Sequence, residues 1–83
     1  MQVTGKVVVV TGGGNGIGKA LCEAFHQAGA ARVVVADIDP DGARTVATPI
    51  GGAAFKCDVG KEKDILHVIE ETEHQFGPIA LFC

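Results

Sequence analysis

Near the beginning of the chain, a β-branched apolar run leads directly into a cluster of glycines: Val7-Val8-Val9-Val10-Thr11-Gly12-Gly13-Gly14-Asn15-Gly16-Ile17-Gly18. Four consecutive valines are typical of a strand that is buried on both faces of a sheet. Five glycines within positions 12–18 leave backbone N–H groups open to a ligand. A helix that begins near Gly16 would add the positive end of its dipole. This segment therefore predicts a phosphate-binding turn between a strand and a helix, with a tight turn that binds nothing as the alternative.

Alternating apolar runs and amphipathic segments predict the other elements. We expect strands over Lys6–Thr11, Arg32–Ala36, Ala53–Cys57 and Ile79–Phe82. The first helix is expected to end at a left-handed Gly29, and the second to begin with Asp39 as N-cap and Pro40 at its first position. Pro49 and Gly51-Gly52 would end the second helix, and the third is expected over 61–76. The order β-α-β-α-β-α-β with short connections predicts an α/β fold, a doubly wound parallel sheet.

The helical periodicity also predicts which side chains face the sheet. One face of the first helix would carry Ile17, Leu21, Ala24, Phe25 and Ala28. One face of the third helix would carry Ile65, Val68, Ile69, Thr72 and Phe76. Cys22 and Cys57 are expected to be small buried groups. His67, Glu71, Glu70 and His74 form pairs four residues apart, which we interpret as a solvated helix face rather than a metal site.

Length and composition limit the classes of protein. Eighty-three residues make at most one small domain, and the net charge is −3 with scattered basic residues, which disfavours nucleic-acid binding. Glycine aside, the longest apolar run is the five residues 79–83, too short to span a membrane. The three cysteines are unclustered and no secretory leader is visible, so we predict reduced thiols, no zinc site and a cytoplasmic location.

Three ligand classes use a loop of this kind. Gly13-x4-Gly18-Lys19 matches most of a nucleoside triphosphate loop, but Ala20 stands where Ser or Thr must hold magnesium. Gly12-x-Gly14-x-Gly16 loosely fits an S-adenosylmethionine methyltransferase, which leaves the Gly16-Ile17-Gly18 ending unexplained. A dinucleotide is the third class, although the standard G-x-G-x-x-G spacing fails because Ile17 stands at its last glycine.

The pattern Thr-Gly-x-x-x-Gly-Ile-Gly over residues 11–18 resembles the cofactor-binding start of the short-chain dehydrogenase/reductase family. Asp37 ends the second strand, 19 residues after Gly18, near the usual place of the acidic residue that binds the ribose. Asp58-Val59 resembles the family's adenine-binding pair, and Gly77-Pro78-Ile79-Ala80-Leu81 resembles its entry into the fourth strand, with Ala80 replacing the usual Asp. The resemblance covers essentially the whole chain and implies a Rossmann-like sheet with further strands after residue 83.

The resemblance also implies the cofactor-binding residues. Thr11 would brace the loop and glycines 12, 16 and 18 would admit the pyrophosphate, with contacts from Asn15 and Ile17. Asp37 would bind the ribose and Asp58 and Val59 the adenine; the full set is Thr11, Gly12, Asn15, Gly16, Ile17, Gly18, Asp37, Ile38, Asp58 and Val59. We predict NAD rather than NADP, since a 2′-phosphate would meet the Asp37 carboxylate and neither Asn15 nor Ile38 is basic. Arg44, close to Asp41, is expected to form a surface pair.

The resemblance further implies hydride transfer between nicotinamide and an alcohol or carbonyl substrate. The family's Ser, Tyr and Lys catalytic residues lie further along, and this chain contains no Tyr. We therefore expect residues 1–83 to be the N-terminal part of a single NAD(P)-binding domain in a longer, homo-oligomeric enzyme. A nucleotide-binding module without catalysis is the alternative.

Overall fold

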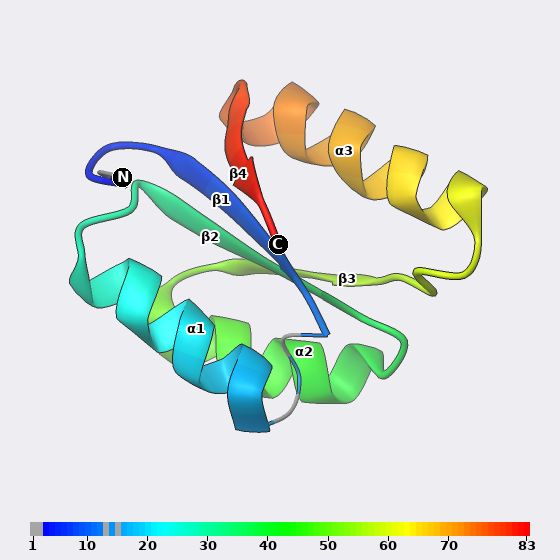
Figure 1. Ribbon diagram of the computed structural model, residues 1–83, viewed down its shortest axis with the longest axis horizontal. Helices are drawn as coiled ribbons and strands as arrows, with labels where there is room; N and C mark the ends of the chain where they lie inside the picture. Colours follow the sequence, from blue (N-terminus) through cyan, green and yellow to red (C-terminus); the bar gives the residue numbers. More distant parts are fainter. Residues whose placement is uncertain (1–2, 13, 15) are drawn as a thin grey trace.

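A computed structural model describes residues 3–12, 14 and 16–83, which form a four-stranded parallel sheet between two layers of helices (Figure 1). The strands are β1 (Val7–Thr11), β2 (Arg32–Asp37), β3 (Ala53–Lys56) and β4 (Ile79–Phe82). The helices are α1 (Gly16–Gln27), α2 (Pro40–Ala47), the short 3-10 helix η1 (Thr48–Ile50) and α3 (Glu62–Phe76). The predicted α/β class and element order are confirmed, and the predicted ends differ by one residue at four places.

The strand order is β3-β2-β1-β4, so the chain crosses back over the sheet between β3 and β4. Every pair is parallel; β1 and β2 are aligned from Val7 opposite Arg32 to Thr11 opposite Ala36. The pairing of β1 with β4 is interrupted: Val7 faces Ile79, but Val8 faces Leu81. The register therefore shifts at Ala80, the position where the resemblance led us to expect Asp.

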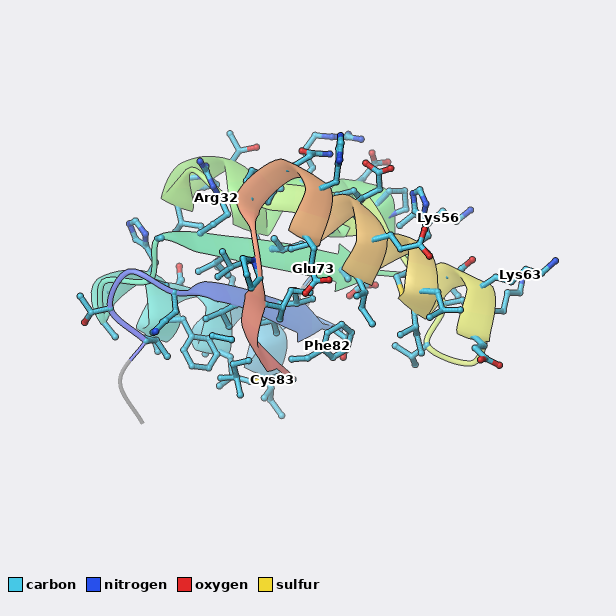
Figure 2. The ribbon with its side chains drawn as sticks, turned by 90° about the horizontal axis from the view of Figure 1, so that it is seen from above. Arg32, Lys56, Lys63, Glu73, Phe82 and Cys83 are labelled. Atoms are coloured by element: carbon cyan, nitrogen blue, oxygen red, sulfur yellow. The ribbon has the colours of Figure 1, made fainter. Side chains whose placement is uncertain are left out.

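The helices cover the two faces of the sheet unequally. In Figure 1, α1 and α2 lie together below the sheet and α3 lies above it. In Figure 2, α3 runs diagonally across the sheet, and Glu73 points from it toward β4, where its carboxylate accepts a 3.4 Å hydrogen bond from the Ile79 N–H. At the same end of the sheet, the Arg32 guanidinium lies 4.8 Å from the centre of the Phe76 ring.

Alternate residues of the strands enter two separate apolar layers, as the period of a strand requires. The layer under α1 and α2 contains Val3, Val8, Val10, Cys22, Val33, Val35, Ala43, Val46 and Ala47. The layer under α3 contains Val9, Val34, Ala36, Cys57 and Val68. The prediction that β1 is buried on both faces is confirmed, and β2 is buried in the same way. The predicted burial of Cys22 and Cys57 is also confirmed.

The predicted sheet-facing side of α1 is wrong except at Phe25. Ile17 is 82% exposed, Leu21 is 39% exposed, and Ala24 and Ala28 are exposed as well, whereas Gly18 and Cys22 are buried. The buried stripe is thus Gly18, Cys22 and part of Phe25, which packs against the lower layer. Small side chains let α1 approach the sheet closely. Gly18 and Cys22 therefore face the sheet, and the larger apolar side chains of Ile17 and Leu21 beside them do not. The predicted face of α3 is correct, with Val68 and Thr72 fully buried.

Local signals at the helix ends form as predicted. Gly29 has a φ of 91°, and the bonds Gly29 N–H to His26 O (3.0 Å) and Ala30 N–H to Phe25 O (3.1 Å) complete a Schellman motif. Asp39 caps α2 by accepting a hydrogen bond from the Asp41 N–H, with Pro40 at the start of the helix. Arg44 pairs with Asp41 at 2.9 Å on the surface, as expected.

Candidate functional site

A cavity of about 300 Å³ lies where the carboxyl ends of β1, β2 and β3 meet. Ligands of open α/β sheets bind at this edge of the sheet. The cavity is lined by five of the predicted cofactor-binding residues and one other: Gly12, Asp37, Ile38, Asp58, Val59 and Cys57. Residues from three separate parts of the sequence therefore come together at one place.

Gly12 turns the chain out of β1 toward the cavity. Its φ of 68° lies in the left-handed region that favours glycine, and its N–H donates to Ala36 O at 2.7 Å. The Thr11 hydroxyl and N–H, just before it, both donate to Cys83 O, at 2.6 and 2.8 Å, so Thr11 ties the end of β1 to the end of β4. Its role in bracing the glycine loop stays a prediction.

Asp37 is only 9% exposed and its carboxylate is held by two backbone groups. Oδ2 accepts a hydrogen bond from the Gly14 N–H at 3.0 Å, and Oδ1 accepts one from the Asp39 N–H at 2.9 Å. Each carboxylate oxygen can accept two hydrogen bonds, and among the described residues each oxygen accepts one, which leaves a second position for a hydroxyl group. Asp37 therefore links the glycine loop to the start of α2 and retains acceptor capacity toward the cavity.

The segment after β3 forms the other wall. The carboxylate of Asp58 accepts from the Gly60 N–H at 2.9 Å, and the Asp58 N–H donates to Asp64 of α3 at 3.0 Å. These bonds fix the turn that presents Val59, whose side chain is 59% exposed. An apolar, exposed side chain beside a carboxylate is a suitable wall for a flat ring with polar edges.

Cys57 lines the cavity, and the sequence predicted only that it is buried. Its side chain is 2% exposed, and burial raises the pKa of the thiol, with smaller contributions from the nearby carboxylates of Asp64 and Asp58. The thiol is thus neutral and acts here as a small apolar wall. Nothing in the residue pattern marked this position as part of a cavity.

The beginning of α1 faces the same edge of the sheet. Gly16 and Ile17 are exposed, whereas Gly18 is buried. The first N–H groups of a helix have no partner within the helix, and α1 begins at Gly16, so these groups of α1 lie at the cavity edge of the sheet. A Cβ built on Gly16 would meet no protein atom within 4 Å, so packing within the described chain does not require glycine there. Asn15, also predicted to contact a cofactor, lies outside the described residues.

The described part of the chain contains neither a cluster of metal-ligating side chains nor a helix able to span a membrane. Residues 3–12, 14 and 16–83 hold no group of three or more His, Cys, Asp or Glu side chains able to share a metal ion. His67 instead lies edge-on to Phe55, with ring centres 6.3 Å apart. Within the same described ranges, every helix is too short or too polar to cross a membrane.

Comparisons with known proteins agree with this architecture. The family model described as short chain dehydrogenase matches residues 6–83. Tropinone reductase-like 1 of Erythroxylum coca is 42% identical over 78 residues, and L-fucose dehydrogenase of Oryctolagus cuniculus is 45% identical over 77 residues. Each alignment covers 92% of this chain, but 28% and 27% of those relatives, respectively.

A solved structure gives the same result for the fold. A crystal structure described as ribose-5-phosphate isomerase from Brucella melitensis 16M superposes with a TM-score of 0.89 at 36% identity, covering 99% of this chain and 32% of that one. The chain belongs to the short chain dehydrogenase family. It spans about a third of the length of the relatives it matches and corresponds to their N-terminal, cofactor-binding portion. The family implies a nicotinamide dinucleotide, NAD or NADP, as cofactor.

Proposed function

We propose that residues 1–83 are the N-terminal part of a single NAD(P)-binding domain, in a full-length enzyme that transfers hydride between NAD and an alcohol or carbonyl substrate. The observation that carries this proposal is the convergence of Gly12, Asp37, Asp58 and Val59 on one cavity at the carboxyl ends of the strands. The relatives named as dehydrogenases and reductases support the class of reaction. The catalytic residues would lie after residue 83, since this chain has no Tyr.

The binding mode follows the order of the elements. The pyrophosphate would lie against Gly12 and the start of α1, where Gly16 leaves open space and the helix dipole favours an anion. The adenosine ribose would present its hydroxyls to the remaining acceptor positions of Asp37. The adenine would lie between Ile38 and Val59, which are 62% and 59% exposed, with Asp58 at its polar edge.

Asp37 supports NAD over NADP. Its carboxylate is fixed by the Gly14 and Asp39 N–H groups, so it cannot easily turn away from a 2′-phosphate. The neighbouring Ile38 brings no positive charge, and the Arg44 guanidinium is paired with Asp41. Like charges held this close would weaken NADP binding by about tenfold or more.

Titration calorimetry of the full-length protein tests the proposal. NAD, NADP and S-adenosylmethionine are each titrated under the same conditions. We expect NAD to bind most tightly and S-adenosylmethionine to give no heat of binding. Equal or tighter binding of NADP would overturn the cofactor preference, and binding of S-adenosylmethionine alone would overturn the proposed function.

A further inference from the structure

One wall of the candidate cavity is a turn that is closed by its own hydrogen bonds. Asp58 Oδ1 accepts a hydrogen bond from the Gly60 N–H at 2.9 Å, and Asp58 O accepts one from the Lys61 N–H at 2.9 Å. Both bonds join near neighbours in the sequence, so they shape the turn but do not fix its place beside the cavity. The Asp58 N–H makes the longer connection: it donates to Oδ2 of Asp64, in the first turn of α3, at 3.0 Å.

The N-terminus of α3 leaves Asp64 available for this bond. Lys61 is the N-cap, and its side chain makes no capping hydrogen bond. In a capping box, the side chain at the position of Asp64 accepts from the N-cap N–H, but here the Lys61 N–H already donates to Asp58 O. Asp64 accepts instead from the Asp58 N–H, and the helix dipole favours a carboxylate at this position. Asp64 therefore anchors the turn to the helix.

The anchored turn carries the polar edge of the proposed adenine site. Asp58 and Val59 line the cavity, whereas Asp64 does not. Oδ1 of Asp58 is bonded to the turn, and within residues 3–12, 14 and 16–83 its Oδ2 accepts no hydrogen bond. A carboxylate is only an acceptor, so it attracts an amino group and repels a carbonyl oxygen. Adenine carries an amino group where hypoxanthine carries a carbonyl, so Asp58 is suited to distinguish these two bases.

We propose that Asp64 is a positioning residue for adenine recognition: by holding the Asp58 N–H, it keeps the Asp58 carboxylate where it accepts the adenine amino group. This inference rests on the proposed dinucleotide site and assigns a role to a residue outside the cavity. Both side chains are only partly buried, so without Asp64 water reaches the freed N–H and the turn can move. The preference for adenine over hypoxanthine would then fall, although every residue that lines the cavity is unchanged.

The test compares two dinucleotides that differ only at this position of the base. Full-length wild type, Asp64→Ala and Asp64→Asn are titrated with NAD and with nicotinamide hypoxanthine dinucleotide, while thermal unfolding is recorded. We expect the wild type to prefer NAD by about tenfold or more, the equivalent of one hydrogen bond to a charged group. Asp64→Ala should bind NAD about fivefold or more weakly and the hypoxanthine dinucleotide almost unchanged. Asp64→Asn keeps an oxygen that accepts the Asp58 N–H, so its preference should lie within about threefold of the wild type.

Two further variants and one measurement on the wild type serve as controls. Glu62→Ala removes an exposed carboxylate from the same helical turn without freeing the Asp58 N–H, so the preference for NAD should not change. Asp58→Ala removes the group that recognises the base, so adding Asp64→Ala to it should change the preference by less than about twofold. Hydrogen exchange of the wild type needs no variant to fold: the Asp58 N–H should exchange about tenfold or more slowly than an unprotected amide.

Failure of the proposed function and failure of this inference give different results. If the wild type binds neither dinucleotide, the proposed function fails and the inference falls with it. If the wild type binds NAD without preferring it, or if Asp64→Ala keeps the wild-type preference, only the positioning role is overturned. An equal loss of affinity for both dinucleotides would also overturn it, because that pattern indicates general damage to the site. Rapid exchange of the Asp58 N–H in the wild type would overturn it as well.

Discussion

Removal of the Asp37 carboxylate is expected to do more than relieve repulsion of a 2′-phosphate. The carboxylate accepts hydrogen bonds from Gly14 N–H at 3.0 Å and Asp39 N–H at 2.9 Å, and the side chain is nearly buried. A hydrogen bond to a charged group contributes about 1.5–3 kcal/mol, and part of this returns when water reaches the freed N–H. We therefore expect Asp37→Ala to lower the free energy of unfolding of the full-length protein by about 2–3 kcal/mol.

The same change should also weaken binding of both cofactors. NAD loses its ribose acceptor and the loop loses its anchor, so NAD affinity should fall by about a hundredfold. NADP should gain little, because the repulsion is relieved but the loop that would bind its diphosphate is no longer held. Asp37→Asn keeps one acceptor oxygen and turns an NH2 group toward an N–H donor, so its effects should fall between wild type and Asp37→Ala.

Urea denaturation and titration calorimetry of the full-length protein measure the two effects. Asp41→Asn is the matched control: it removes an exposed carboxylate of the same segment, which among the described residues pairs with Arg44 on the surface, so stability should change by less than about 0.5 kcal/mol. The reasoning is refuted if Asp37→Ala is as stable as the control and binds NADP as tightly as the wild type binds NAD.

Three further predictions concern stability. Gly29→Ala should lower the free energy of unfolding by about 1 kcal/mol or more, since a Cβ is disfavoured at a φ of 91°. Thr72→Val should raise it by about 1 kcal/mol, because the buried Thr72 Oγ1 has no hydrogen-bond partner among the described residues. Burial raises the pKa of the Cys22 thiol from its usual 9.0 to about 11, so the unfolded chain loses this proton first. The contribution of the Cys22 thiol to the free energy of unfolding is therefore fully present below pH 9 and is lost as the pH rises to about 11. In Cys22→Ala, the free energy of unfolding should fall less over this pH range than in the wild type.

Chemical denaturation at fixed pH measures the first two changes, and a series from pH 8 to 11 measures the third, each with the wild type in parallel. An unchanged stability for Gly29→Ala would contradict the role of the Schellman turn. A destabilised Thr72→Val would mean that the hydroxyl has a partner in solution. Identical pH curves for wild type and Cys22→Ala would show that the thiol does not titrate as its burial requires.

Much of the fold could be predicted because its determinants are local. Valine runs, the Gly29 cap and the Asp39-Pro40 helix start act within a few residues, so the strands and the third helix were placed to within one residue of their observed ends. The second helix was expected to end at Pro49 and Gly51-Gly52, but α2 ends at Ala47 and the 3-10 helix η1 follows it. The regular alternation of strands and helices then left few topologies, since parallel crossovers have one preferred hand. The residues Asp37, Asp58 and Val59 could be placed at one edge because parallel strands all end on the same side.

Packing between distant segments decided the rest. Helical periodicity alone predicted that Ile17 and Leu21 of α1 pack against the sheet. In the structure Gly18 and Cys22 make this contact instead, because their small side chains let the helix come close to the sheet. The partner of the Thr11 hydroxyl, 72 residues away, is likewise a property of strand order. The sequence predicted most of the residues that surround the cavity, but not Cys57. Only the tertiary structure decided that the Asp37 carboxylate joins the Gly14 N–H to the Asp39 N–H, since this contact links segments with no local signal for each other.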